Sequence, residues 1–479
     1  MKLFITIITA LSIVLSANAQ SFLAGWDFDG VSSTATSHTA NWGSLSGSAT
    51  LSYDHAGVNI PIKFTSDYQI SGSYDSAVVG IDFLSVGDFN GTDPSTGYTS
   101  FAGNDIPANA QQGINFVGPG TVTINWGLAL TDTGTVSYSK LENRPGFKIK
   151  KSKNFKKFEF DLRKDEYVIK QLNKTALLSY LEYVNGKIVV DEITPKDRFG
   201  KIFKNNSKYV SNSMGKSIIS YITGHAICRG YITGINHKLN DWPILESTLY
   251  YDQPIINLLN MASGDYKYIK TKGGGEFKNS SRWVNEYSVQ SFMKNEMKNT
   301  TPGKNKYHYS NLNTNLIGSY VLYKMGRKDF KKMLNEIFVD KVGIEYDMVI
   351  KQQPKAKRSQ ASLTYGMHVT RYDYLRIAVA MLDDWNNNTC EGQYLKSLFE
   401  NRIKKGNVNN KNTREGFSHP KHYGGQFHIG ISKKRDKPIF ILDGFGGQNI
   451  TIDFENNKII AILSIHRDHN WMKLVHSKF

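Results

Sequence analysis

A serine and a lysine three residues apart could together form a nucleophile. On a helix the two side chains share a face, and a lysine amine kept neutral by burial or by nearby cations can accept the serine proton. The chain contains four Ser-x-x-Lys copies, at Ser137/Lys140, Ser213/Lys216, Ser291/Lys294 and Ser418/Lys421. The pattern alone is therefore weak, and its surroundings must separate the copies.

The copy at Ser213 opens a segment with helical periodicity. Ile218, Ile219, Ile222 and Ala226 recur on one side, which places the serine at a helix N-terminus, where backbone N–H groups and the helix dipole favour an oxyanion. The first copy lies in a strand-like segment and the fourth contains a proline. The third lies in an amphipathic segment with no neighbouring hairpin. Ser213 and Lys216 are therefore the candidate nucleophile and its activator.

A β-hairpin is predicted just before this helix, and a second one near the C-terminus. Residues 176–184 and 187–193 flank Asn185-Gly186, the dipeptide most typical of a tight hairpin turn. Residues 450–454 and 458–465 form the second alternating pair. The first hairpin leads into the serine helix, which predicts strand–helix packing around the nucleophile.

Two further motifs could complete the site. In Tyr309-Ser310-Asn311, Tyr309 could share a proton with Ser213 and Lys216, and Asn311 could hold the lysine or a substrate amide. The glycine-rich run from Asp443 to Gln448 would let the backbone approach a substrate and donate an N–H to an oxyanion.

The ordered set resembles the serine hydrolases related to class C β-lactamases, a group that includes penicillin-binding D-alanyl-D-alanine peptidases, esterases and aminohexanoate-oligomer hydrolases. Its motifs are Ser213-Met214-Gly215-Lys216, Tyr309-Ser310-Asn311 and Gly444-Phe445-Gly446-Gly447-Gln448. Supporting segments are Leu258 to Gly264, Pro302-Gly303, Tyr365-Gly366-Met367 and Thr370 to Asp373. The likeness covers about residues 170–470.

The resemblance implies an α+β domain: an antiparallel sheet built from both chain ends, flanked by helices, with a helical lobe. It further implies Ser213 as the acyl-forming nucleophile, Lys216 and Tyr309 as the proton-transfer pair, and Asn311 as a substrate-positioning residue. Gly444, Phe445, Gly446 and Gly447 would form the oxyanion and substrate strand. There the Ser213 amide and one near Phe445–Gly446 would bind the oxyanion.

One motif departs from the group. Where the β-lactamases and peptidases carry Lys-Thr-Gly, this chain has Leu442-Asp443-Gly444, or Gly444-Phe445-Gly446 in another register. The lysine is missing, and with it a cation that would meet a substrate carboxylate. A neutral ester or amide is therefore the favoured substrate. A D,D-peptidase or β-lactamase and a catalytically inactive binding module remain the alternatives.

The chain is expected to be exported and to contain two domains. Residues 1–19 have the charged start, apolar centre and Ala-x-Ala end of a signal peptide, which predicts a secreted or periplasmic protein. Residues 21–139 have one Lys against ten Asp, a net charge of −9, which leaves +25 for residues 140–479 once Lys2 is set aside. This break predicts an all-β, sandwich-like accessory domain over 20–140 and the hydrolase domain over 145–479.

The composition and residue spacing also indicate which cofactors and binding partners to expect. No later apolar run is long enough for a membrane span, and no zinc-finger spacing or RNA-reading signature is present, so we expect neither cofactor nor nucleic acid. The basic half could draw an anionic cell-surface polymer, although a Lys/Asn bias spread over a solvated surface is the favoured explanation. His419, His422 and His428 lack a fixed metal-ligand spacing. Cys228 is expected as a buried apolar side chain, and its pairing with Cys390 is left open.

Overall fold

The computed structural model describes residues 146–175, 177–196, 200, 203–269, 288–353, 356–406, 420–431, 434, 436–444, 447–464 and 469–479. Before residue 146 it describes the backbone of short strands only: β1 (Gly25–Asp27), β2 (Ser48–His55), β3 (Val58–Thr65), β4 (Ser76–Gly80), β5 (Phe89–Asp93), β6 (Tyr98–Phe101), β7 (Asn104–Pro107), β8 (Gly113–Val117) and β9 (Val122–Ile124). They pair as β1-β2-β3, β4-β8-β9 and β5-β6-β7. Whether these strands form one sandwich-like domain stays a prediction, and residues 1–19 lie outside the described part.

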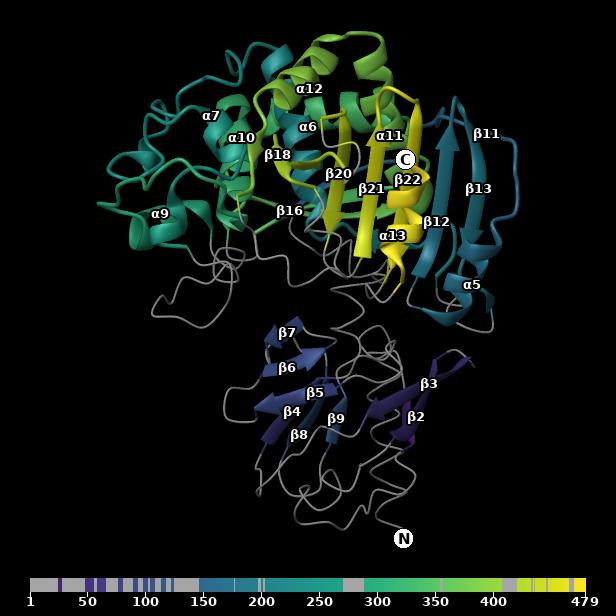
Figure 1. Cartoon of the computed structure of the whole chain (residues 1–479). Helices are drawn as coiled ribbons and strands as arrows, with labels where there is room; N and C mark the ends of the chain where they lie inside the picture. The colour runs from purple at the N-terminus through teal and green to yellow at the C-terminus, as the bar shows by residue number, and fades with distance from the viewer. Residues whose placement is uncertain are drawn as a thin grey trace.

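A nine-stranded sheet forms the centre of the C-terminal part, with the order β11-β13-β12-β22-β21-β20-β19-β18-β17 (Figure 1). Its strands are β11 (Glu159–Phe160), β12 (Leu177–Val184), β13 (Lys187–Ile193), β17 (Ile403–Lys404), β18 (His422–Gly424), β19 (Phe427–Ile429), β20 (Ile439–Gly444), β21 (Gln448–Asp453) and β22 (Lys458–Ser464). All pairs are antiparallel except β11 with β13. The two ends of this part meet where β12 pairs with β22, as the sequence predicts.

Both predicted hairpins are present. At the turn between β12 and β13, Asn185 and Gly186 have φ angles of 46° and 95°. This is the left-handed pair that a two-residue turn of this type requires. The second hairpin is β21–β22, and the turn between its strands contains Asn457 at φ 48°.

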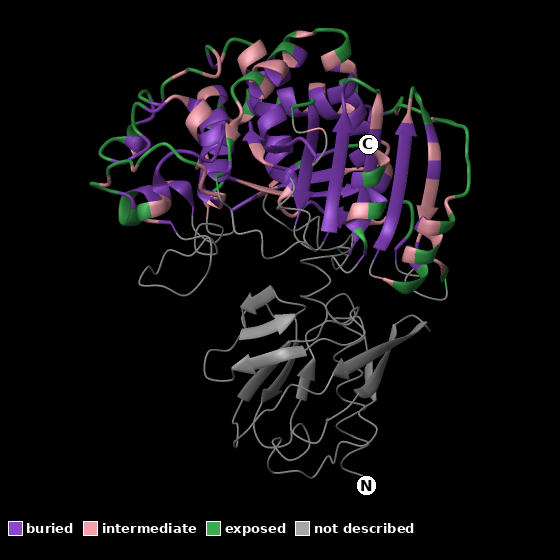
Figure 2. Cartoon of the chain, in the orientation of Figure 1, coloured by how far each residue is buried: buried purple, intermediate pink, exposed green. Residues whose placement is uncertain are grey.

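The central strands are buried on both faces, as Figure 2 shows. In β22, Ile459, Ala461 and Leu463 belong to one hydrophobic core, while Ile460 and Ile462 belong to the other. Because side chains alternate along a strand, a strand covered on both faces carries an almost continuous apolar run.

Helices cover these two faces. The smaller core packs against α5 (Glu166–Lys174) and α13 (Trp471–Leu474), and the larger one against α6 (Met214–Cys228), α11 (Arg371–Asn386) and α12 (Cys390–Glu400). The lobe beside them contains α7 (Ile255–Leu259), α9 (Val289–Glu296) and α10 (Asn311–Asn335), with the short turns Pro243–Leu245, Asp265–Lys267 and Glu336–Lys341 (Figure 1). The helix α10 is interrupted at Gly326, which has φ 70° and ψ 160°. A last short turn covers His476–Lys478.

A second, four-stranded sheet supports the serine helix, with the order β10-β15-β16-β14. Its strands are β10 (Gly146–Ile149), β14 (Lys208–Val210), β15 (Met348–Gln352) and β16 (Leu363–Thr370). The edge strand β14 leads directly into α6. None of the described helices combines the length and apolar character that crossing a bilayer requires.

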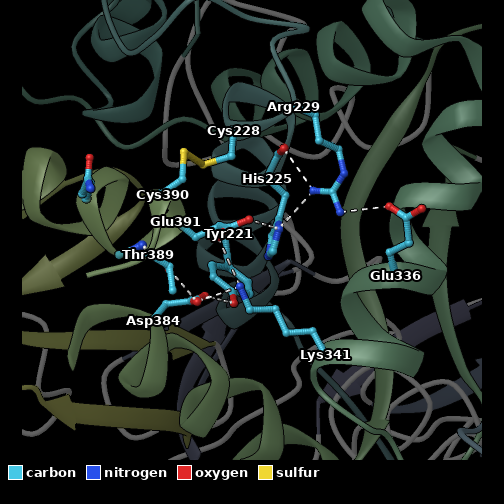
Figure 3. A network of polar contacts seen from close by, with 12 residues as sticks. Tyr221, His225, Cys228, Arg229, Glu336, Lys341, Asp384, Thr389, Cys390 and Glu391 are labelled. Carbon is cyan, nitrogen blue, oxygen red and sulfur yellow. Dashed lines mark hydrogen bonds and ion pairs between the residues drawn. A yellow bond between two sulfur atoms is a disulfide. The ribbon is translucent and has the colours of Figure 1, made fainter. Parts of the chain in front are cut away.

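The C-terminal end of α6 is fastened to α12 by a disulfide between Cys228 and Cys390 (Figure 3). The expectation of a buried apolar Cys228 is therefore wrong. This residue lies at the last, half-buried turn of its helix, with its Cα atom 5.8 Å from that of Cys390. Such a distance permits a disulfide.

Partly buried ion pairs lie near this disulfide (Figure 3). Glu391 bonds His225 of α6 at 2.8 Å, and Lys341 contacts Asp384 at 2.7 Å and Glu391 at 3.3 Å. The hydroxyl of Tyr221, also on α6, donates to Asp384. The hydrogen bond from His225 holds the pKa of Glu391 well below its usual range. These contacts tie the far end of the serine helix to three other segments.

We expect the disulfide to stabilise the chain, because it closes a loop whose ends are 162 residues apart. The double variant Cys228→Ser/Cys390→Ser should lose about 2–5 kcal/mol of unfolding free energy. The measurement is the thermal midpoint of unfolding, with the reduced natural chain as the matched control. Equal midpoints for the oxidised chain and the double variant would contradict the expectation.

Candidate active site

The chain turns sharply from β14 into α6, and Ser213 lies at this turn. The Ser211 amide donates to the Met367 carbonyl of β16 at 2.8 Å, and the Met367 amide donates to Ser211 Oγ at 3.0 Å. Asn212 then takes a left-handed φ of 45°, a conformation that Asn adopts more readily than most residues. Ser213 occupies the N-cap position of α6, and its hydroxyl makes no capping hydrogen bond. The side chain is thus presented at the helix N-terminus.

Lys216, one turn further on, contacts the hydroxyl of Ser213. Its Nζ donates to Ser213 Oγ at 2.9 Å, and the residue is 1% exposed. Residues 214–226 are buried on every side of α6, because the helix lies between the two sheets and the lobe instead of on the surface. Burial disfavours the ammonium form, and it lowers the pKa of Lys216 well below 10.5. The neutral amine that a proton acceptor needs is therefore favoured.

Two aromatic rings surround the lysine amine. Lys216 Nζ lies 3.4 Å from the ring centroid of Tyr365 and 5.0 Å from that of Tyr309. The face of an aromatic ring attracts a cation, so these rings would stabilise an ammonium form of Lys216. Tyr365 belongs to β16, and its motif was noted in the sequence without this role. Tyr365 is far from Lys216 in the sequence, and no local pattern indicates that their side chains meet.

Tyr309 reaches the same serine from the lobe. Its side chain is half-buried and makes a hydrogen bond with Ser213. Burial raises the pKa of Tyr309 well above 10.0, and the negative charge of Asp443 raises it further, while the bond with Ser213 acts in the opposite direction. Tyr309 therefore keeps its proton and is available as a hydrogen-bond donor.

A neighbouring loop holds Tyr309 in place. The His308 amide donates to the Met261 carbonyl at 2.7 Å, and the Gly303 amide donates to that of Gly264 at 3.0 Å. The motif around residues 258–264 thus serves as the support of the Tyr309 segment. Asn311 is the first residue of α10 and is half-buried. Asn311 follows Tyr309 by two residues and so belongs to the same segment, which leads into α10.

The end of β20 approaches the serine from the other side. A Cβ atom on Gly444 would lie 2.7 Å from the Ser211 carbonyl oxygen, so only glycine allows this contact between β20 and the turn before Ser213. Gly447 begins the return toward β21 with φ 92°. Phe445 and Gly446 lie outside the described residues, so their predicted contribution to the oxyanion site stays a prediction.

The other candidate residues lie elsewhere. In the third Ser-x-x-Lys copy, Lys294 of α9 is exposed, while the first copy and Ser418 fall outside the described residues. His419 also falls outside them. Among the residues that the structure describes, no group of three or more His, Cys, Asp or Glu side chains is placed to hold a metal ion. His428 instead accepts a hydrogen bond from Lys405 at 2.7 Å.

Comparison with solved structures identifies the fold. A Bacillus anthracis protein classed as a 6-aminohexanoate-dimer hydrolase superposes with a TM-score of 0.52 at 14% identity, covering 71% of this chain and 90% of the other. A β-lactamase-like protein from Bacteroides dorei gives 0.47 at 13%, covering 63% and 89%. A penicillin-binding protein from Bacillus halodurans gives 0.43 at 13%, covering 66% and 100%. No family model matches the sequence, and no curated protein does.

The C-terminal part therefore has the α+β fold of the β-lactamase and penicillin-binding-protein serine hydrolases, the group that the sequence motifs resemble. Within this fold, the geometry joins Ser213, Lys216 and Tyr309 at one point.

Gly215 is a sensitive test of this geometry, because a Cβ atom there would overlap the Tyr365 carbonyl oxygen. We expect Gly215→Ala to push α6 away from β16 and to cost about 1–3 kcal/mol of unfolding free energy. Thermal unfolding measures the loss. The matched control is Gly318→Ala in α10, where the added methyl group meets only side-chain ends at 3.2–3.6 Å. Equal stability of the two variants would argue against close helix–strand packing at the serine.

Proposed function

We propose that this chain is a serine hydrolase that cleaves an ester or amide bond through an acyl-enzyme on Ser213. The observation that carries the proposal is the 2.9 Å contact between Ser213 Oγ and the buried Lys216 Nζ. Burying a lysine with a depressed pKa is costly to stability. Its position beside the half-buried hydroxyl of Ser213 gives a functional reason for this burial.

The first half-reaction forms the acyl-enzyme. Neutral Lys216 accepts the Ser213 proton while Oγ attacks the substrate carbonyl carbon, and the ring of Tyr365 stabilises the ammonium produced. The developing oxyanion lies near the N-terminus of α6, where helix amides favour negative charge. Tyr309 then donates its proton to the leaving oxygen or nitrogen and regains one from Lys216, so Lys216 ends the step neutral.

The second half-reaction reverses the proton movements. Water takes the place of the leaving group and attacks the ester on Ser213, and its proton passes through Tyr309 or Lys216 to the serine oxygen as the acyl bond breaks. The carboxylic acid product leaves, and the starting protonation state is restored. The protonated state of Tyr309 supports the donor role, and the neutral state of Lys216 supports the acceptor role.

The proposal includes the finer sequence-based predictions. We propose that residues 1–19 direct export, that the enzyme acts outside the cytoplasm, and that residues 20–140 form an accessory β-domain for a substrate or an anionic surface. The disulfide at Cys228 supports an oxidising compartment, since reducing ones rarely retain such bonds.

We expect Ser213→Ala and Lys216→Ala each to lower kcat by several orders of magnitude, because nucleophile and activator act as a unit. Tyr309→Phe should lower kcat about 10²–10⁴-fold, the usual effect of a positioned acid or base. The measurements are ester hydrolysis and covalent labelling by a fluorophosphonate. A folded chain that the probe never labels would favour an inactive binding module, and an unchanged kcat in Tyr309→Phe would exclude that residue from the mechanism.

Substrate class separates an esterase or amidase from the D,D-peptidase and β-lactamase alternative. The described part of the segment from Leu442 to Gln448 offers one charge, the carboxylate of Asp443. An unpaired substrate carboxylate in such a site would cost several kcal/mol. We expect kcat/KM for a short neutral ester to be at least about tenfold above that for a cephalosporin or a D-Ala-D-Ala peptide. A higher kcat/KM for the cephalosporin or the peptide in the same preparation would favour the D,D-peptidase or β-lactamase function over the esterase or amidase function.

A further inference from the structure

Four buried polar side chains line the sheet beside Tyr309, and the proposed mechanism uses none of them. They are Lys405, Tyr423, His428 and Asp443, and we call them the polar wall. Tyr423 is 1% exposed, His428 5%, Lys405 7% and Asp443 8%. Burying a lysine and a carboxylate is unfavourable unless each has a partner, so their presence in one place requires a reason.

The strand register puts these residues on one face of the sheet. His428 of β19 lies opposite Tyr423 of β18 on one side and opposite Ile441 of β20 on the other. Cross-strand partners project from the same face, and so do residues two apart on one strand. Asp443, two residues after Ile441, therefore projects from the same face as His428. Lys405 follows β17 and donates from Nζ to His428 Nδ1 at 2.7 Å.

The polar wall continues to the catalytic tyrosine. The ring of Tyr423 lies 5.0 Å from that of His428 and 6.4 Å from that of Tyr309, measured between centroids. Asp443 immediately precedes Gly444, the residue that packs against the turn before Ser213. The charge of Asp443 acts on both ends of the wall, since it raises the pKa of Tyr309 and that of Lys405.

The polar wall contains two charges of opposite sign. Lys405 supplies the cation and Asp443 the anion, and Asn449 Nδ2 donates to Asp443 Oδ1 at 3.1 Å. Lys421, whose carbonyl accepts the Lys405 amide hydrogen, is a second cation nearby, but it is half-exposed and therefore screened by water. A substrate carboxylate entering this region would meet the Asp443 carboxylate and a lysine whose charge is already balanced.

We propose that Asp443 and Lys405 form a balanced pair of buried charges that makes the Ser213 site select uncharged acyl groups over acyl groups carrying a carboxylate. The inference rests on the proposed hydrolase function and adds two specificity-determining residues to it. An uncharged acyl chain leaves the pair undisturbed, whereas a carboxylate would have to compete with Asp443 for the Lys405 ammonium.

The test is a comparison of two acyl esters of 4-nitrophenol, the butyrate and the glutarate half-ester, on the full chain. The readout is the ratio of kcat/KM for glutarate to that for butyrate, which cancels general losses of activity. Asp443→Asn should raise this ratio about ten- to a hundredfold, because Lys405 then pairs with the substrate carboxylate. The double variant Asp443→Asn/Lys405→Met should return the ratio to near the natural value.

The pH dependence provides a second readout. Burial lowers the pKa of Lys405 to about 7, and Asp443 opposes this shift. In Asp443→Asn that opposition is lost, so Lys405 is protonated only at lower pH. The gain in the glutarate ratio should therefore be larger at pH 6 than at pH 8. The matched control is Lys404→Met, an exposed neighbour of Lys405, which should leave the ratio at the natural value.

Two results would overturn the proposal. The first is an Asp443→Asn variant that hydrolyses butyrate with an unchanged ratio. The second is a gain that persists in full in the double variant, which would mean that loss of repulsion alone is responsible and that Lys405 takes no part. Failure of the hydrolase function is distinguishable, because it would appear as a natural chain that hydrolyses neither ester and whose Ser213 is not labelled by a neutral fluorophosphonate.

Discussion

The contact between a buried lysine amine and a serine hydroxyl is the constraint on which the rest of the structure depends. Lys216 can accept a proton only if it is kept from water, and α6 achieves this by lying between two sheets and a helical lobe instead of at the surface. Other elements must therefore pack against every face of α6. The four-stranded sheet, the end of β20 and the loop before α10 do so, and each brings a residue of the site with it.

Close approach of backbone to backbone is the second requirement, and glycine meets it on both sides of the serine. Gly215 lets α6 rest on the Tyr365 carbonyl, and Gly444 lets β20 reach the turn at Ser211. The far end of α6 is fixed differently, by the disulfide to α12 and by ion pairs around Glu391. The helix is thus held at its Ser213 end by packing and at its other end by covalent and ionic contacts. Such rigidity suits a nucleophile whose geometry must be preorganised.

The electrostatics of the site divide into two layers. Next to Ser213, burial favours neutral Lys216 and protonated Tyr309, so the acceptor and donor roles proposed for them follow chiefly from desolvation. Behind Tyr309, the polar wall holds a cation and an anion that oppose one another. In the proposed hydrolase, the charges of Asp443 and Lys405 would set the substrate specificity. The reactivity of Ser213 would depend instead on Lys216 and Tyr309 being uncharged.

The sequence by itself determined the local features of this protein. The Asn185-Gly186 turn, the start of a helix at Ser213 and the Ser-x-x-Lys spacing depend on neighbours within a few residues, and the order of the motifs indicated the fold. Only the tertiary structure could decide which distant groups meet. The contact of Tyr365 with Lys216 and the disulfide at Cys228 join segments far apart in the chain. Which distant residues meet depends on how the whole core packs and which side chains it buries. A local pattern of residue types does not contain this information.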